Sequence, residues 1–392
     1  MAGGVGAAIA KAFTDEVLTS EFFDTYWEKR PLHWRAAEQG KHANQVPRVM
    51  QVDDLVTCLR RGNVKLFRKG DSYEDNFAVG YLDGASLILN QAERNHPVLL
   101  DFCKTVAQSH FHHVFAVLYL TPPNSHAVRL HNDDQDVFLL QLWGRKHWKV
   151  RNAPQFLAYT EEMLGKAKPV PEELIGEATE LTMEPHDVLY IPRGVLHEAS
   201  TGTELSLHVT ITVPTSDYCW GVQLAKHLAQ ELAPHSHRLS DKSMASLKHS
   251  AVDEVEKVMQ AWIANLSLDS VAQGFEARMK RTNEGQAHGA IQAQNLPLPP
   301  AVTEASRVRL LPGVTGHCGS SVAHFIRDDG QIEVPLAEGT AQLVQSLTTR
   351  PQTVRDLPCG DPFARICVLQ ALHQLGVLQL FCSDARDLYE TN

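Results

Sequence analysis

Hydrophobic residues recur along the chain with two different periods, and the change of period divides it into zones. Between about residues 14 and 62, bulky aromatic residues recur near helical spacing until Pro31 interrupts them, which predicts N-terminal helices. From about 78 to 214 the pattern changes to short apolar runs separated by turn-forming residues. Many short strands with turns between them indicate a barrel or a two-sheet jelly roll rather than a parallel α/β sheet.

Five apolar runs in this central zone are predicted to be strands, bounded by the turn sequences PPN, WGR, PRG and TGT. They cover residues 114–121, 136–143, 146–150, 187–192 and 205–213. The segment between the third and fourth runs, residues 154–180, is rich in Glu and Leu. We expect it to form an exposed helical excursion from the sheet.

Helical periodicity returns from about residue 217 to residue 282. There Val255, Val258, Trp262 and Leu266 form an apolar stripe with i, i+3, i+7, i+11 spacing. Such a stripe usually packs within its own domain and less often forms a dimer interface.

The last part of the chain begins with a change of composition. Residues 283–306, rich in Gln, Ala and Pro, are expected to be a linker. Residues 307–392 contain two strand-like runs and a helical segment, FARICVLQALHQLGVLQLF, over 363–381. This part is small enough to be a winged-helix-like module, but it carries slightly more acidic than basic side chains, so we expect no direct DNA binding.

Composition and charge narrow the class of protein. The chain has 392 residues, of which 43% are hydrophobic and 21% charged, as in ordinary globular proteins. Its formal net charge is −10, which argues against a broad nucleic-acid-binding surface. The seven cysteines form no CxxC pair, so neither a zinc knuckle nor a disulfide framework is expected. Without a secretory leader or a long apolar run, we expect a soluble protein of a reducing intracellular compartment.

The stretch RLHNDDQDVFLLQLWGRKHW, residues 129–148, carries the candidate chemistry. His131 and Asp133 are two positions apart, so in an extended chain both side chains lie on one face. His197 follows a predicted strand and a Pro-Arg-Gly turn. Two imidazoles and one carboxylate on one face of a metal form the facial triad of non-haem Fe(II) oxygenases, which leaves positions open for a chelating 2-oxo acid and for O2.

A His-x-Asp pair is common by chance, and its setting makes this one informative. Lys146 follows His131 by 15 residues and could pair with the far carboxylate of a 2-oxo acid, although an exposed lysine at a strand edge is an equally simple interpretation. Other histidine pairs, such as His110 and His112, are interpreted as surface or packing residues.

The motifs HxDxxDVFxLQxxGRKxW, DVLYxPRGxxH and SxHxTI together resemble those of the JmjC ribosomal oxygenases, a family within the cupin-like 2-oxoglutarate/Fe(II) superfamily. Three flanking features are similar as well: FFDTYWEKRPLHW (22–34), LDGASLIL (82–89) and the Trp220-Gly221 pair. The resemblance implies an α+β chain with a double-stranded β-helix, or jelly-roll, core. It also implies three domains, namely a catalytic domain over 1–214, a helical dimerisation domain over 215–290 and a winged-helix-like domain over 307–392.

The resemblance also assigns roles to residues. His131, Asp133 and His197 match the iron ligands, and Lys146 falls where the family binds the C5 carboxylate of 2-oxoglutarate. The positions implied to face the cofactor or substrate pocket are Tyr119, Thr212, His208 and Asn132. His208 could equally be a core histidine with a backbone partner. Val117 is a departure, because human-type relatives have Asn there, and its loss removes one amide that could contact 2-oxoglutarate.

The function implied is hydroxylation of a protein by a 2-oxoglutarate- and Fe(II)-dependent dioxygenase. The expected target is C3 of a His side chain, or less favourably of an Arg side chain, in a large-subunit ribosomal protein. A homodimer is implied, located in the nucleus or nucleolus of a eukaryote or in the cytoplasm of a bacterium. Two alternatives stay open: a JmjC histone lysyl demethylase, and a non-catalytic cupin-like binding protein.

Overall fold

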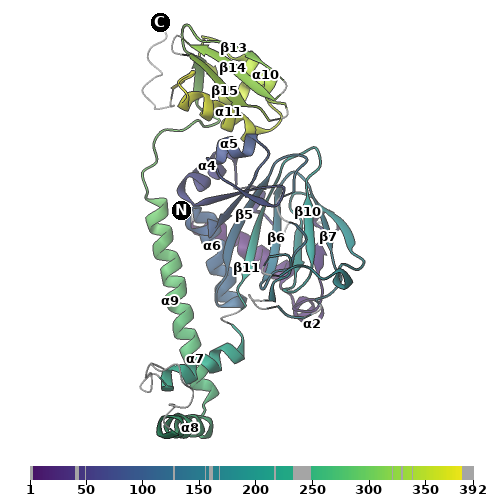
Figure 1. Cartoon of the computed structure of the whole chain (residues 1–392), viewed down its shortest axis with the longest axis vertical. Helices are drawn as coiled ribbons and strands as arrows, with labels where there is room; N and C mark the ends of the chain where they lie inside the picture. Colours follow the sequence, from purple (N-terminus) through teal and green to yellow (C-terminus); the bar gives the residue numbers. More distant parts are fainter. Residues whose placement is uncertain are drawn as a thin grey trace.

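Two antiparallel sheets face each other in the computed structural model and form a jelly roll, with helices packed on the outside (Figure 1). The structure describes residues 3–39, 44–48, 50–126, 129–154, 156–158, 162–166, 168–215, 218–232, 249–319, 321–327, 330–337 and 339–381. Within these residues no helix combines the length and the apolar character needed to cross a bilayer.

The larger sheet has eight antiparallel strands in the order β1-β9-β6-β11-β5-β4-β2-β3. Their bounds are β1 Leu32–Trp34, β2 Val64–Arg68, β3 Asp71–Tyr73, β4 Ser86–Asn90, β5 Phe115–Thr121, β6 Asp136–Trp143, β9 Val188–Ile191 and β11 Ser206–Val213. The smaller sheet has the order β10-β7-β8, with β7 Lys146–Val150, β8 Thr179–Met183 and β10 His197–Ser200. All five strands predicted from the sequence are confirmed to within one residue at each end.

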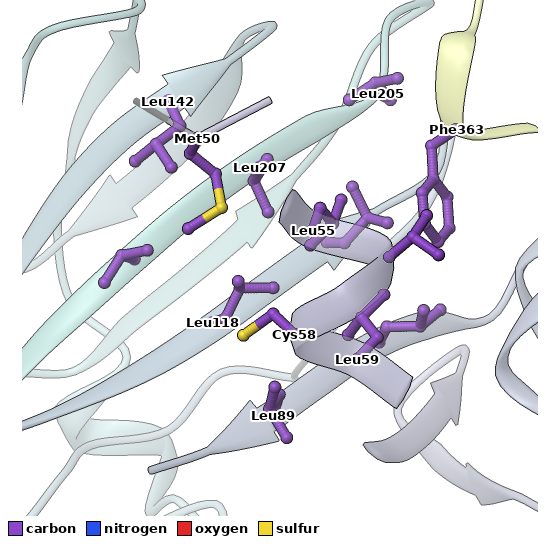
Figure 2. Packing of buried hydrophobic residues seen from close by; sticks show 14 of the residues in the cluster. Met50, Leu55, Cys58, Leu59, Leu89, Leu118, Leu142, Leu205, Leu207 and Phe363 are labelled. Atoms are coloured by element: carbon purple, nitrogen blue, oxygen red, sulfur yellow. The ribbon is translucent and has the colours of Figure 1, made fainter. Parts of the chain in front are cut away.

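Both faces of the large sheet are covered, which explains why its central strands have nearly continuous apolar sequences. A small core that includes Val137, Leu139 and Trp148 occupies part of the space between the two sheets. Helices cover the other face: α1 Gly3–Val17, α2 Ser20–Thr25, α4 Val52–Arg61 and α6 Pro97–Val106. Figure 2 shows α4 packing Leu55 and Cys58 against the sheet. Two shorter helices, α3 Ala36–Gln39 and α5 Phe77–Leu82, complete this part of the chain.

The excursion over 154–180 differs from the expectation. Its described residues contain no α-helix, and the 3-10 turn Glu172–Leu174 is only three residues long. Pro154, Gly165, Pro169 and Pro171 interrupt the Glu- and Leu-rich sequence, and each of them is unfavourable within a helix.

Three helices follow the jelly roll: α7 Trp220–Leu232, α8 His249–Ala264 and α9 Leu268–Gln294. In Figure 1, α9 runs beside the barrel, whereas α7 and α8 lie beyond one end of it. The four residues of the predicted stripe, Val255, Val258, Trp262 and Leu266, are all half-buried, and Trp262 donates a hydrogen bond from Nε1 to His227 Nδ1 of α7 at 2.8 Å. Ile263, which is outside the stripe, is 64% exposed. Leu266 lies beyond the end of α8.

The linker expected at 283–306 begins later than predicted, because α9 continues to Gln294. Polar side chains of α9 bind the barrel. Gln286 donates from Nε2 to Glu93 Oε1 and to the carbonyl of Val114, both at 3.0 Å. Asn283 bonds to the ring of His113 through Oδ1 at 2.7 Å. The first part of the Gln-rich segment, residues 283–294, therefore belongs to a helix that packs on the barrel through its polar side chains.

Residues 307–381 form two three-stranded sheets and two helices. The strands are β12 Arg307–Leu310, β13 Thr315–Cys318, β14 Val322–Arg327, β15 Gly330–Pro335, β16 Gln352–Thr353 and β17 Leu378–Phe381, and the helices are α10 Ala341–Ser346 and α11 Pro362–Gln374. The single helix predicted over 363–381 is therefore wrong in its last third. Gly376, at φ +67°, ends the helical path, and the chain continues into β17. α11 packs on α5, where Tyr81 donates to Asp361 Oδ2 at 2.6 Å.

Candidate metal and cofactor site

A single antiparallel bridge brings His131 and His197 together. The backbone N–H of His131 donates to the carbonyl of His197 at 3.1 Å, and the reverse bond measures 2.8 Å. Directly opposed residues in such a bridge project their side chains to the same face. The two imidazole rings accordingly lie with their centroids 4.3 Å apart at the edge of the smaller sheet.

Asp133 completes the cluster that the sequence predicted. One potential ligand atom from each of His131, Asp133 and His197 lies within 4.8 Å of the others. The Nε2 atoms of His131 and His197 are 3.9 Å and 3.6 Å from oxygens of Asp133. Among the described residues this is the only group of three or more His, Cys, Asp or Glu side chains close enough to hold one ion.

The hydrogen bonds of the two histidines orient their lone pairs toward the cluster. His131 Nδ1 is 2.7 Å from the carbonyl of Arg129, and His197 Nδ1 is 2.9 Å from the carbonyl of Val195. A carbonyl only accepts, so each Nδ1 carries the proton and each Nε2 keeps its lone pair for a metal. The donor set is therefore two neutral imidazoles and one carboxylate.

The electrostatics keep these groups in their ligating protonation states. Burial, with a smaller contribution from His197, lowers the pKa of His131 to about 3, and burial also lowers the pKa of His197. Burial opposes ionisation of Asp133, but the ammonium of Lys166 and the two imidazoles outweigh it, so the pKa of this carboxyl lies below its usual range. Metal binding near neutral pH would thus displace no proton from the histidines.

Lys166 lies against the cluster and was not predicted from the sequence. Its ammonium is in close contact with Oδ1 of Asp133. The preceding residue, Gly165, has φ +76°, and a Cβ there would lie 2.1 Å from the carbonyl of Leu130 and 2.8 Å from Cα of His131. Only glycine allows the excursion to lie this close to a metal ligand.

A cavity of about 400 Å³ between the two sheets extends from this cluster. Lys146 lines it and is only 1% exposed. Its ammonium donates to Thr121 Oγ1 at 2.7 Å, and no carboxylate of the described residues forms an ion pair with it. Burial lowers the pKa of Lys146 to about 7. A buried ammonium bonded to one hydroxyl is stabilised by an anion, so this end of the cavity suits a carboxylate ligand.

The other predicted pocket residues divide into two groups. Tyr119, His208 and Thr212 line the cavity, as does Val117, which presents an apolar wall. The rings of Tyr119 and His208 stack at 4.9 Å and 8°, and Nδ1 of His208 is buried without a hydrogen-bond partner. The backbone partner considered for His208 is therefore not observed for this nitrogen.

The prediction that Asn132 faces the pocket is wrong, because this residue does not line the cavity. Its Oδ1 accepts from the backbone N–H of Leu164 at 2.7 Å, and its Nδ2 lies 3.4 Å from the carbonyl of Gly194. As the residue between the two ligands, it points to the opposite face. Asn132 thus ties the segment of His131 and Asp133 both to the excursion and to the Pro-Arg-Gly turn that precedes His197.

Further cavity residues lay outside the prediction. Trp148 is in a predicted strand and has the same inward parity as Lys146, so strand alternation could have identified it. Asn90 is the last residue of β4, Gln91 follows it, and Lys166 lies in irregular structure. The sequence contains no periodic signal that would place these three residues at the site.

The chain was compared with known proteins. Residues 89–219 match the family model described as the JmjC domain. A bifunctional lysine-specific demethylase and histidyl-hydroxylase NO66 from Culex quinquefasciatus is 27% identical over 74% of this chain and 52% of its own length. Ribosomal oxygenase 1 from Gallus gallus is 30% identical over 54% of this chain and 37% of its own length. The chain thus spans about half, or less, of the curated relatives it matches.

Among solved structures, the Escherichia coli ribosomal oxygenase YcfD is similar with a TM-score of 0.46 and 16% sequence identity, over 92% of this chain and 97% of that one. The matched JmjC segment contains β5 to β11 and all three residues of the metal cluster. Residues 89–219 of this chain therefore match the JmjC domain, and the chain has homologues named NO66 and ribosomal oxygenase.

Proposed function

We propose that this protein is a 2-oxoglutarate- and Fe(II)-dependent protein hydroxylase, with His131, Asp133 and His197 as the iron ligands. The observation that carries the proposal is the pairing of this cluster with Lys146 in one cavity. A metal-binding protein without a 2-oxo acid has no need of an ammonium buried between the two sheets. A 2-oxo dicarboxylate explains both features, because one end chelates the metal and the other end neutralises Lys146.

The chain's own residues would bind and orient this cosubstrate. Lys146 and Thr121 would hold the far carboxylate, and Tyr119 and Trp148 would form the walls beside it. Iron with bound 2-oxoglutarate and O2 supplies the oxidising chemistry in enzymes of this kind. The apolar residues Val117, Val137 and Leu139 would exclude water from the reacting centre.

We further propose that the substrate is a ribosomal protein and that the target is C3 of a histidine side chain, with arginine less favoured. Support comes from the names of the relatives, which include a histidyl-hydroxylase and a ribosomal oxygenase. The test is incubation of His- and Arg-containing ribosomal-protein peptides with the enzyme, Fe(II) and 2-oxoglutarate, followed by mass spectrometry. A gain of one oxygen on a histidine, absent with Asp133→Ala, is expected. A panel that gains no oxygen on any residue would overturn the assignment.

Lysine demethylation is the second candidate, because the same relatives are also named lysine-specific demethylases. It needs the same metal and cosubstrate, so the residues described above do not separate the two activities. Methylated histone peptides in the same assay do separate them. Loss of a methyl group without oxygen gain on the ribosomal peptides would favour demethylation.

We also propose a domain organisation for the rest of the chain. Residues 215–290, which contain α7, α8 and most of α9, would form a dimer interface, and residues 307–392 would form a winged-helix-like domain. The exposed Met259 and Ile263 on α8 support the first part, since they leave apolar surface uncovered in the single chain.

A further inference from the structure

A second cavity of about 440 Å³ lies beside the ends of β6 and β11 that also border the metal-site cavity. Its position follows from strand alternation. Val213 of β11 pairs with Asp136 of β6, and both line this second cavity. The next pair, Thr212 and Val137, lines the metal-site cavity. The two cavities thus lie on opposite faces of the same two strand ends.

The walls of the second cavity are mainly aromatic. Trp27 stacks on Phe111 at 5.1 Å and 26°, and Tyr218 meets the ring of Phe275 edge-on at 5.5 Å. Trp220, at the start of α7, is 58% exposed at the cavity although it is the largest type of apolar side chain. An exposed tryptophan beside further aromatic rings is typical of a binding site.

The side chains of the lining that can carry a charge near neutral pH are three carboxyl groups and two histidines, and burial raises the pKa of one carboxyl group, that of Asp136, to about 7. Glu28, Asp136 and Glu276 line the cavity, and no Lys or Arg of the described residues does. Glu28 forms an ion pair with Arg193 at 3.0 Å, and Asp136 accepts the hydroxyl of Tyr190 at 2.6 Å. Glu276 on α9 is exposed and forms no ion pair with a described residue. Glu276 is therefore the carboxylate of this cavity that is available to form an ion pair with a bound cationic ligand.

We propose that this cavity binds an arginine side chain of the polypeptide on which the enzyme acts. A guanidinium is planar, stacks on aromatic faces and pairs with carboxylates, so it uses both features of the lining. That the arginine belongs to a protein substrate rests on the proposed function; the binding of arginine itself does not. The site would hold a substrate residue outside the metal centre and so select basic segments.

The test is fluorescence anisotropy of a dye-labelled peptide with one arginine, against twins with citrulline or lysine at that position, on the full-length protein. Citrulline keeps the shape of arginine and removes its charge. We expect the arginine peptide to bind about three- to fivefold more tightly than the citrulline peptide, the size expected for one exposed charge pair with ring stacking. Glu276→Gln and Phe275→Leu should each remove most of this difference.

Glu284→Gln is the matched control, because Glu284 is exposed on the same helix and does not line the cavity. It makes the same change to a chain whose net charge is −10, so it reports general attraction of cations. Equal affinity for the arginine and citrulline peptides, equal affinity for lysine, or an effect of Glu284→Gln as large as that of Glu276→Gln would each overturn the proposal. A protein that discriminates arginine but hydroxylates nothing would refute the proposed function and leave this inference standing.

Discussion

Lys146 is the residue at which stability and proposed function conflict most clearly. Burial lowers its pKa to about 7 from the ordinary lysine value of 10.5, so the ligand-free fold disfavours the charged form. Between pH 10 and pH 7 the unfolded chain gains a proton at this site and the folded chain largely does not. Lys146 therefore destabilises the ligand-free protein increasingly as the pH falls through this range, and the effect levels off below pH 7.

Lys146→Met should accordingly stabilise the ligand-free protein while strongly reducing 2-oxoglutarate turnover at low cosubstrate concentration. We expect a gain on the order of 1–3 kcal/mol at pH 7, or roughly 2–4 °C in Tm for each kcal/mol, and a smaller gain at pH 10. Thermal unfolding at both pH values measures it. A lower Tm at pH 7 would show that the ammonium has an anionic partner in the ligand-free fold.

Lys166 is expected to compete with the metal, because its ammonium contacts the Asp133 oxygen that an ion would use. Lys166→Met should tighten Mn(II) binding about threefold, a small factor because this lysine is partly exposed. Isothermal titration measures the change. Lys168→Met, an exposed lysine two residues away, is the control and should leave the affinity unchanged. Weaker binding in Lys166→Met would mean that this lysine supports the site.

At the scale of elements, the excursion over 154–180 packs against the metal site at Gly165, which lies beside the backbone of Leu130 and His131. Gly165→Ala would place a Cβ against the backbone of Leu130 and His131 at a positive φ. We expect at least tenfold weaker Mn(II) binding with the fold retained, judged by titration and far-UV circular dichroism. Gly176→Ala, where a Cβ meets no atom within 4 Å, is the matched control. Unchanged affinity in Gly165→Ala would show that the excursion moves independently of His131.

Helix α9 should depend on its polar contacts with the barrel. Gln286→Ala leaves the buried carboxylate of Glu93 with one bond fewer, which should cost about 1–3 kcal/mol in the free energy of unfolding. Gln292→Ala on the same helix removes only an exposed contact with His288 and should cost less than about 0.5 kcal/mol. Urea unfolding compares them, and equal costs would contradict the docking described here.

The elements could be predicted from the sequence to different degrees, for physical reasons. β5, β6, β9 and β11 are apolar runs between turn residues because both of their faces are covered, whereas β7 alternates buried and exposed residues. β10 is short and half-polar, and α9 contacts the barrel through polar side chains such as Gln286. Neither element therefore has a clear apolar pattern. Similarly, His131, Asp133 and Lys146 lie in or beside a patterned strand, whereas the roles of Lys166 and Gly165 arise only from tertiary packing.

At the scale of the whole molecule, the uncovered apolar residues of α8 bear on oligomeric state. We expect a homodimer in solution, and size-exclusion chromatography with light scattering at micromolar concentration measures it. Ile263→Glu should shift the protein toward the monomer, whereas Gln260→Glu, on the same helix, should not. A wild-type monomer would remove the proposed role of α7–α9.

The central claim is that one cavity joins the three-residue metal cluster to a lysine that anchors a 2-oxo acid. Its most direct test is Fe(II)-dependent conversion of 2-oxoglutarate to succinate by the wild-type protein, His131→Ala and Lys146→Met. We predict succinate formation by the wild type, none with His131→Ala, and recovery of part of the Lys146→Met activity at high 2-oxoglutarate concentration. Succinate formed equally by all three proteins, or by none of them, would contradict the account.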